Sequence, residues 1–297
     1  MTAEVHAFPD EAGPAGRFAD ALGLPLNLIR PHAFPDGESR PTVTATTGGT
    51  AILYRSLARP DGRLMPLLLA ADALRRAGAT QVDLVAPYLP YMRQDRVFTP
   101  GEPLSQAVMG RVLSEAFDRI LTLEAHLHRT PDLAAVFPGR PARNVGGAGI
   151  LAAALARLTP RVDLVAGPDS ESLAWASQVA SHIAAGLLVA RKQRRGDRDV
   201  SVQYPDDIRL RGAHVAIVDD ICSSGGTLMA AARALKAAGA ARVTSAVVHG
   251  LHDADVARAL KAAGIDRLIA TDSVAGPGRR LPVAGVLARA WGEMDAG

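Results

Sequence analysis

The stretch that decides the fold runs from Val215 to Leu228 and reads VAIVDDICSSGGTL. It opens with apolar, mostly β-branched residues, a composition typical of a strand that is buried on both faces of a parallel sheet. The strand is expected to end at two adjacent acids, Asp219 and Asp220. Apolar residues then recur at helical spacing until Gly239, a typical helix stop. The sequence therefore predicts a strand, a tight loop and a helix in that order.

The loop between this strand and helix is built to hold an anion. Gly225 and Gly226 let the backbone approach a ligand closely, and the N–H groups at the start of the helix point at it. The hydroxyls of Ser223, Ser224 and Thr227 can complete a cup around a phosphate monoester. The two acids repel a phosphate but suit sugar hydroxyls or a magnesium ion. A phosphorylated sugar satisfies both halves, whereas a plain strand end followed by a turn is the simpler alternative.

Length and composition favour two soluble domains that act on small phosphorylated molecules. The chain has 297 residues, of which 48% are hydrophobic and 21% charged, an ordinary globular balance. Aromatic residues make up only 4%, which argues against a stacking surface for single-stranded nucleic acid. The net charge of +3 suits phosphorylated substrates, but no dense Lys/Arg run suggests a polyanion partner.

The same composition limits the cellular setting. A single cysteine, Cys222, excludes an internal disulfide and a cysteine-rich metal site. The first residues lack the pattern of a signal peptide, and no apolar run is long enough to span a bilayer. We therefore expect a cytoplasmic protein with no membrane partner.

Strand-like and helix-like segments alternate along both halves of the chain, which predicts an α/β fold with mostly parallel sheets flanked by helices. In the first half we expect strands at residues 4–8, 26–29, 50–54, 81–86 and 119–123, and helices at residues 14–22, 61–77 and 104–117. In the second half we expect strands at residues 162–166, 187–191, 214–218, 243–248 and 267–271, and further helices at residues 149–158, 171–185 and 254–263. The similar layout of the halves suggests an ancient duplication.

A Gly/Pro-rich passage at residues 138–149 is the best candidate for a domain boundary. We expect an N-terminal domain at residues 1–143 and a C-terminal domain at residues 144–279. The last segment, residues 280–297, is expected to pack back onto the first domain.

Two further motifs carry polar chemistry. The run FPDGE, from Phe34 to Glu38, is either a ligand-binding segment or a simple Pro-Asp-Gly turn. The run YMRQDR, from Tyr91 to Arg96, follows the predicted strand 81–86, and ligands bind at the carboxyl ends of strands in open α/β sheets. Its arginines offer forked donors for a polyphosphate, although surface loops also carry structural arginines.

The two-acid loop resembles the phosphoribosyl-pyrophosphate (PRPP) loop of the type I phosphoribosyltransferase fold. That loop occurs in enzymes that consume PRPP and in enzymes that make it. The order and spacing of all three motifs, across essentially the whole chain, resemble the ribose-phosphate pyrophosphokinase (PRPP synthetase) family in its compact, archaeal-like form. Simple transferases lack the first two motifs and the first domain.

The resemblance implies two tandem phosphoribosyltransferase-like domains and a specific reaction. The diphosphoryl group of ATP would pass to the C1 hydroxyl of ribose 5-phosphate, giving PRPP and AMP for nucleotide biosynthesis, with Mg²⁺ as cofactor. The family also implies a homo-oligomer whose site often uses a neighbouring subunit. A related sugar-phosphate kinase, a phosphoribosyltransferase-like enzyme and a non-catalytic regulatory relative of PRPP synthetase remain alternatives.

The resemblance also assigns a role to each matching residue. It implies catalysis by the basic pair Lys192 and Arg194, and metal binding by His126 and Asp169. Contacts to ATP would come from Phe34, Asp36, Glu38, Arg93, Gln94 and His126. Contacts to ribose 5-phosphate would come from Asp219, Asp220, Ser223, Ser224, Gly225, Gly226 and Thr227.

Three residues depart from the family pattern. Glu171 places a carboxylate in a pyrophosphate loop that is usually glycine-rich, Glu124 replaces the usual aspartate, and Ser224 stands where threonine is common. Glu171 is expected to point away from the ligand, at a helix start that favours a negative charge. The chain is also shorter than the bacterial class of the family that is activated by phosphate and inhibited by ADP. Hexamer assembly and that allosteric control are therefore not expected to carry over.

Overall fold

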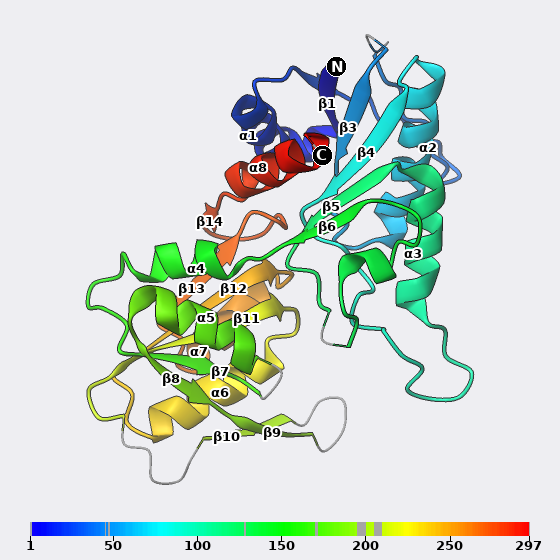
Figure 1. The fold of residues 1–297 in the computed structure, drawn as a ribbon. Coiled ribbons are helices and arrows are strands. Elements are labelled where there is room, and N and C mark those ends of the chain that lie inside the picture. The colour runs from blue at the N-terminus through cyan, green and yellow to red at the C-terminus, as the bar shows by residue number, and fades with distance from the viewer. Residues whose placement is uncertain are drawn as a thin grey trace. The chain divides into compact units, whose positions relative to one another are not determined.

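A computed structural model describes residues 2–44, 46, 48–127, 129–169, 172–194, 200–204 and 210–296, with only the backbone of residues 191–194, 200 and 201. Two compact units make up the chain (Figure 1). Unit 1 comprises Met1–Val145 and Pro282–Gly297, and unit 2 comprises Gly146–Leu281.

Unit 1 is built on a six-stranded sheet with the order β2-β1-β3-β4-β5-β6. Every neighbouring pair in this sheet is parallel. Its central strands are mostly apolar, as expected where helices cover both faces. The strands are β1 (Ala3–Ala7), β2 (Leu26–Leu28), β3 (Thr50–Tyr54), β4 (Gln81–Ala86), β5 (Arg119–Leu123) and β6 (Ala142–Val145).

Helices cover both faces of this sheet. On one face, α1 (Ala12–Leu22) packs against the last helix of the chain, α8 (Ala284–Asp295) (Figure 1). On the other face lie α2 (Asp61–Arg76) and α3 (Ser105–Ala116), whose leucines pack onto β3 and β4 in one apolar core. The short 3₁₀ helices η1 (Pro9–Glu11) and η2 (Leu133–Ala135) complete the unit.

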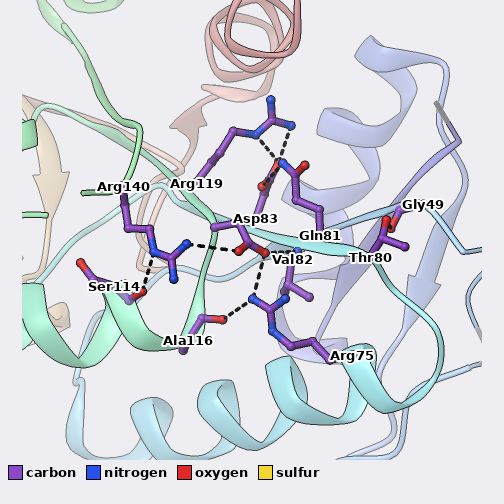
Figure 2. A network of polar contacts seen from close by, with 11 residues as sticks. Gly49, Arg75, Thr80, Gln81, Val82, Asp83, Ser114, Ala116, Arg119 and Arg140 are labelled. Carbon is purple, nitrogen blue, oxygen red and sulfur yellow. Dashed lines mark hydrogen bonds and ion pairs between the residues drawn. The ribbon is translucent and has the colours of Figure 1, made fainter. Parts of the chain in front are cut away.

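A buried carboxylate ties α8 to the sheet. Asp83 in β4 accepts hydrogen bonds from Trp291 Nε1 at 3.0 Å and from Arg119 Nη2 at 2.7 Å. Gln81 Nε2 donates to the same carboxylate at 2.8 Å, and Figure 2 shows Arg119 and Gln81 converging on Asp83. Arg119 also donates to Asp295 at the end of α8. The last segment of the chain is therefore an integral part of unit 1.

Unit 2 has a second six-stranded sheet, in the order β14-β13-β12-β11-β7-β8, again with parallel neighbours. Its strands are β7 (Leu164–Gly167), β8 (Gly186–Val189), β11 (His214–Cys222), β12 (Arg242–Gly250), β13 (Arg267–Thr271) and β14 (Arg280–Leu281). Its helices are α4 (Ala148–Leu155), α5 (Leu173–Ile183), α6 (Gly226–Ala237) and α7 (Ala254–Ala262). The leucines and alanines of α6 pack onto β11 and β12.

Among the strands, two edge strands and one two-stranded ribbon were not predicted from the residue pattern. Strand β6 lies inside the Gly/Pro-rich passage, and β14 is only a two-residue strand. A two-stranded antiparallel ribbon, β9 (Arg191–Arg194) with β10 (Val200–Gln203), stands in the polar insertion that precedes β11. All three are edge or isolated strands, which bury little apolar surface and so leave a weak hydrophobic pattern.

The prediction of an α/β fold with two mostly parallel sheets flanked by helices is confirmed. The two sheets also share one connectivity, because β2-β1-β3-β4-β5-β6 and β8-β7-β11-β12-β13-β14 follow the same course along the chain. This match supports the duplication that the sequence suggested. No helix in the described ranges is long and apolar enough to cross a membrane.

Candidate active site

The two acids of unit 2 lie within β11 rather than after it. The strand runs to Cys222, so the prediction that it ends at Asp219 was wrong. Strand β12 continues alongside, pairing His249 with Ile221 and Gly250 with Cys222. The backbone ladder therefore extends past the acids, because ladder hydrogen bonds do not depend on the polarity of the side chains.

The hydroxyl-glycine loop connects β11 to the start of α6. Ser223 and Ser224 are exposed, and Thr227 is partly buried in the first turn of the helix. Gly225 caps α6 with a φ of 73°, a left-handed conformation that favours glycine. A Cβ at Gly225 would also lie 3.0 Å from Val256 of α7. The glycine is therefore favoured by both the turn and the packing at the start of α6.

Three carboxylates gather beside this loop. Burial raises the pKa of Asp219 well above its usual range, and the neighbouring charges of Asp220 and then Asp169 raise it further. Asp169 comes from the loop after β7, the strand next to β11, so neighbouring segments deliver acids to one edge of the sheet. Mutual repulsion of this kind is relieved by a cation or by hydroxyl donors.

A resident magnesium cage is not part of this arrangement. Among the described residues, no group of three or more His, Cys, Asp or Glu is spaced to hold a metal ion. Magnesium usually keeps several waters and takes only one or two protein carboxylates together with substrate phosphates. The raised pKa of Asp219 beside two further carboxylates therefore fits a Mg²⁺ ion that arrives with a phosphorylated substrate.

Unit 1 gathers other predicted residues at the carboxyl edge of its own sheet. Arg93 and Gln94 follow β4 and are exposed, and half-buried His126 follows β5, the next strand in the sheet. The two loops are joined by an ion pair of 3.2 Å between Arg129 and Asp95. Buried Met92 anchors the first loop in the core. The structure thus presents a guanidinium, an amide and an imidazole at one edge.

The FPDGE run forms the tip of an exposed hairpin. Phe34 N–H donates to Glu38 O at 2.8 Å, and Glu38 N–H donates to the Asp36 carboxylate at 3.1 Å. The ring of Phe34 meets His32 edge-on, with ring centroids 4.5 Å apart. This hairpin follows β2, the edge strand, and β1 and β3 lie between β2 and β4 in the sheet.

Several predicted residues cannot be placed in full. Lys192 and Arg194 lie in β9, opposite Val202 and Val200 of β10, and only their backbone is described. Glu171 lies outside the described residues. Glu124 adopts a left-handed φ of 40° just before His126.

Sequence reasoning missed Tyr204, which lies just beyond β10. Its side chain is buried, and burial followed by the charge of Asp169 raises the pKa of its hydroxyl. The hydroxyl has no hydrogen-bond partner within the part of the chain that the structure describes. A lone tyrosine in a polar stretch gives no sequence pattern, so only the fold could bring it to notice.

Comparison with known families matches both units. A family model described as the N-terminal domain of ribose phosphate pyrophosphokinase matches residues 12–116. A second model, described as a phosphoribosyl transferase domain, matches residues 148–272. Among solved structures, a phosphoribosylpyrophosphate synthetase from Mycobacterium smegmatis superposes with a TM-score of 0.83, covering 100% of both chains at 23% identity. That likeness shows a shared fold.

Curated relatives cover nearly the full chain. The ribose-phosphate pyrophosphokinase of Methanopyrus kandleri is 35% identical over 276 residues, which are 92% of this chain and 93% of the relative. The protein of the same name from Thermococcus kodakarensis is 31% identical, covering 91% of this chain and 96% of that protein. With this identity over almost all of both chains, the protein belongs to the ribose-phosphate pyrophosphokinase family.

Proposed function

We propose that this protein transfers the diphosphoryl group of ATP to the C1 hydroxyl of ribose 5-phosphate, giving PRPP and AMP. One observation carries the proposal: an exposed hydroxyl-glycine loop and two acids stand at the carboxyl edge of unit 2, in a chain similar along its length to proteins named ribose-phosphate pyrophosphokinase. Such a loop binds the phosphorylated sugar.

The sugar phosphate binds to unit 2. Its 5-phosphate accepts hydrogen bonds from the hydroxyls of Ser223, Ser224 and Thr227 and from N–H groups at Gly225 and Gly226, where the helix dipole of α6 also favours an anion. The ribose hydroxyls donate to Asp219 and Asp220. Carboxylates are the complementary partners for hydroxyl donors, which is why the acids and the cup can serve one substrate.

ATP binds through residues of unit 1. Arg93 offers a planar fork of donors to the phosphates, and Gln94 and His126 lie at the same edge. The adenine is assigned to Phe34, Asp36 and Glu38, which sit at the hairpin tip. We accordingly keep the predicted domains, residues 1–143 with 280–297 as the ATP half and residues 144–279 as the sugar-phosphate half, as part of the proposal.

Mg²⁺ is the implied cofactor. Asp169 and His126 are the residues assigned to metal binding, together with oxygens of the substrate phosphates. When bound, the ion would supply positive charge that neutralises the phosphate oxygens. The crowding of Asp219 by Asp220 and Asp169 supports a cation at this edge.

Catalysis requires positive charge and in-line positioning more than covalent chemistry. We assign the positive charge to Lys192 and Arg194 on the β9–β10 ribbon. The ribbon stands outside both main sheets, and Val202 of β10 packs into the core of unit 2, which fixes the base from which the basic pair on β9 would cover the substrates and exclude water.

We also propose that the enzyme works as a homo-oligomer. The hairpin of Phe34 is exposed and follows an edge strand, away from the β4 loop of its own chain. Apolar side chains are exposed on neighbouring helices, with Met65 59% and Leu69 39% accessible on α2, and Val108 44% accessible on α3. Exposed apolar surface of this kind is typical of a protein–protein interface.

The nucleotide product with ATP, Mg²⁺ and ribose 5-phosphate tests the proposal. AMP is expected, formed in a 1:1 ratio with PRPP. ADP as the product would identify a sugar-phosphate kinase instead. No turnover of ATP, combined with PRPP-dependent transfer to a base, would identify a transferase, and no reaction of either kind would identify a regulatory relative.

A further inference from the structure

The shared connectivity of the two sheets makes their loops directly comparable. In both sheets the strand order reverses at one pair, β1/β3 in unit 1 and β7/β11 in unit 2. Ligands of open α/β sheets bind at the carboxyl ends of the strands at such a reversal. In unit 2 this place holds the Asp169 loop and the hydroxyl-glycine loop. The equivalent place in unit 1 has no assigned role.

In unit 1, acidic residues follow β1 and arginines follow β3. Asp10 and Glu11 lie in η1, directly after β1, while Arg55 follows β3 and Arg63 lies in the first turns of α2. Unit 2 has two acids at the end of β11, whereas unit 1 has arginines after the equivalent strand β3. In unit 1 these arginines balance the acids that follow β1, whereas the acids of unit 2 repel one another.

The two arginines hold the two carboxylates as they would hold an oxyanion. Arg55 Nη1 donates to Asp10 at 2.6 Å and lies 3.4 Å from Glu11, and Arg63 Nη1 and Nη2 reach Glu11 at 3.1 Å and Asp10 at 3.0 Å. The backbone N–H of Ser56 donates to Glu11 at 2.9 Å. Forked guanidinium groups joined by a backbone N–H are the donors that proteins use for phosphate.

The donor set is built into the core rather than spread on the surface. Arg55 is only 6% exposed, and the face of Phe8 lies under its guanidinium at 4.4 Å, which fixes the orientation of the donors. Its Nε is buried with no hydrogen-bond partner among the described residues, so the site retains a donor that the carboxylates do not satisfy. Asp10 is half exposed, which leaves a route from solvent.

We propose that Arg55, Arg63 and the Ser56 N–H form a latent phosphate site in unit 1, and that Asp10 and Glu11 act as its built-in substitute ligand. The carboxylates keep phosphates out of this site. This assignment rests on the geometry of unit 1 and stands independently of the reaction proposed above.

The test uses calorimetry to measure the binding of inorganic phosphate to the full-length protein at constant ionic strength. The variant Asp10→Asn/Glu11→Gln is expected to gain one phosphate site per chain, with an apparent Kd at least about tenfold lower than any wild-type binding there. Adding Arg63→Met should abolish the gained site, which separates it from phosphate bound in unit 2. A folded double variant that binds phosphate as the wild type does would overturn the proposal.

Two further variants keep the test decisive. Asp72→Asn removes a carboxylate that pairs with Arg76 on the exposed side of α2, and it should leave phosphate binding unchanged. If the double variant does not fold, Asp10→Asn alone removes only the half-exposed acid. It should show a smaller gain that Arg63→Met reverses, and the absence of that gain in the folded single variant counts against the latent site.

Discussion

Lys192 and Arg194 are the residues on which the proposed catalysis depends most. Replacing either by alanine should lower kcat about 100-fold or more while changing the KM for ATP much less, because their charge acts on the transition state. Steady-state kinetics with varied ATP check this split. Arg233→Ala, an exposed arginine on α6, is the matched control and should keep wild-type kcat. Unchanged turnover in the Lys192 and Arg194 variants would remove both from the mechanism.

Gly225 is predicted to be indispensable for a conformational reason. Gly225→Ala places a Cβ at a left-handed φ of 73° and 3.0 Å from Val256, so it should destabilise the fold by at least about 1 kcal/mol and raise the KM for ribose 5-phosphate. Chemical denaturation and kinetics measure the two effects. Gly226→Ala meets nothing closer than 3.8 Å and should leave the free energy of unfolding nearly unchanged. Equal stability of the two variants would contradict the argument.

Glu11 makes stability depend on pH. Burial, partly offset by Arg55 and Arg63, raises the pKa of Glu11 to about 7 from 4.5. Between these two pKa values the folded state binds more protons than the unfolded state. The stabilising contribution of Glu11 to the free energy of unfolding is therefore fully present below pH 4.5 and is lost as the pH rises through 7. The wild type should therefore lose up to about 1.4 kcal/mol per pH unit, relative to Glu11→Gln, across this window. If the free energies of unfolding of the wild type and of Glu11→Gln change in parallel from pH 5 to 8, this prediction is wrong.

The sequence predicted site chemistry where residue types clustered along the chain. Asp219, Asp220 and the hydroxyl-glycine loop are consecutive, and the structure places them at one strand end with Asp169 nearby. Tyr204 was missed because its proximity to Asp169 arises only in the folded chain. The pair of Arg55 with Glu11 was missed for the same reason, since 44 residues separate them.

Among the elements, α8 is predicted to stabilise unit 1 through one buried hydrogen bond. Trp291→Phe removes the donor to Asp83 while keeping most of the apolar contact, and should cost about 1–2 kcal/mol. Trp175→Phe in α5 is the matched control, because the buried Nε1 of Trp175 has no partner among the described residues. That change should be neutral or slightly stabilising. Thermal and chemical unfolding compare the two, and equal losses would contradict the role of the Asp83 bond.

Helices and strands were predicted correctly where burial requires a regular apolar pattern in the sequence, and they were missed where an element is only partly buried. Strands β3, β4 and β11 are apolar runs covered on both faces, and their positions were predicted within a few residues. Strand β6 reads ARNV and is only partly buried, so its sequence lacks the apolar run of an inner strand. The end of β11 was misplaced because its partner β12 continues past the acids, which a single strand's sequence does not reveal.

At the scale of the whole molecule, two units of one connectivity differ in charge at equivalent places. Unit 2 collects carboxylates at its reversal point, and unit 1 fills its own reversal point with internal ion pairs. This difference supports the proposed division into a sugar-phosphate half and an ATP half. Full-length similarity to ribose-phosphate pyrophosphokinases accords with both halves being needed for one reaction.

The fate of the transferred phosphorus atoms tests this account most directly. ATP labelled in its β-phosphate is incubated with Mg²⁺ and ribose 5-phosphate, and the products are followed by phosphorus NMR. The account predicts that the β-label moves to the phosphate bonded to C1 of the sugar, with AMP left unlabelled. Label retained in ADP, or found in free pyrophosphate without a sugar diphosphate, would contradict diphosphoryl transfer.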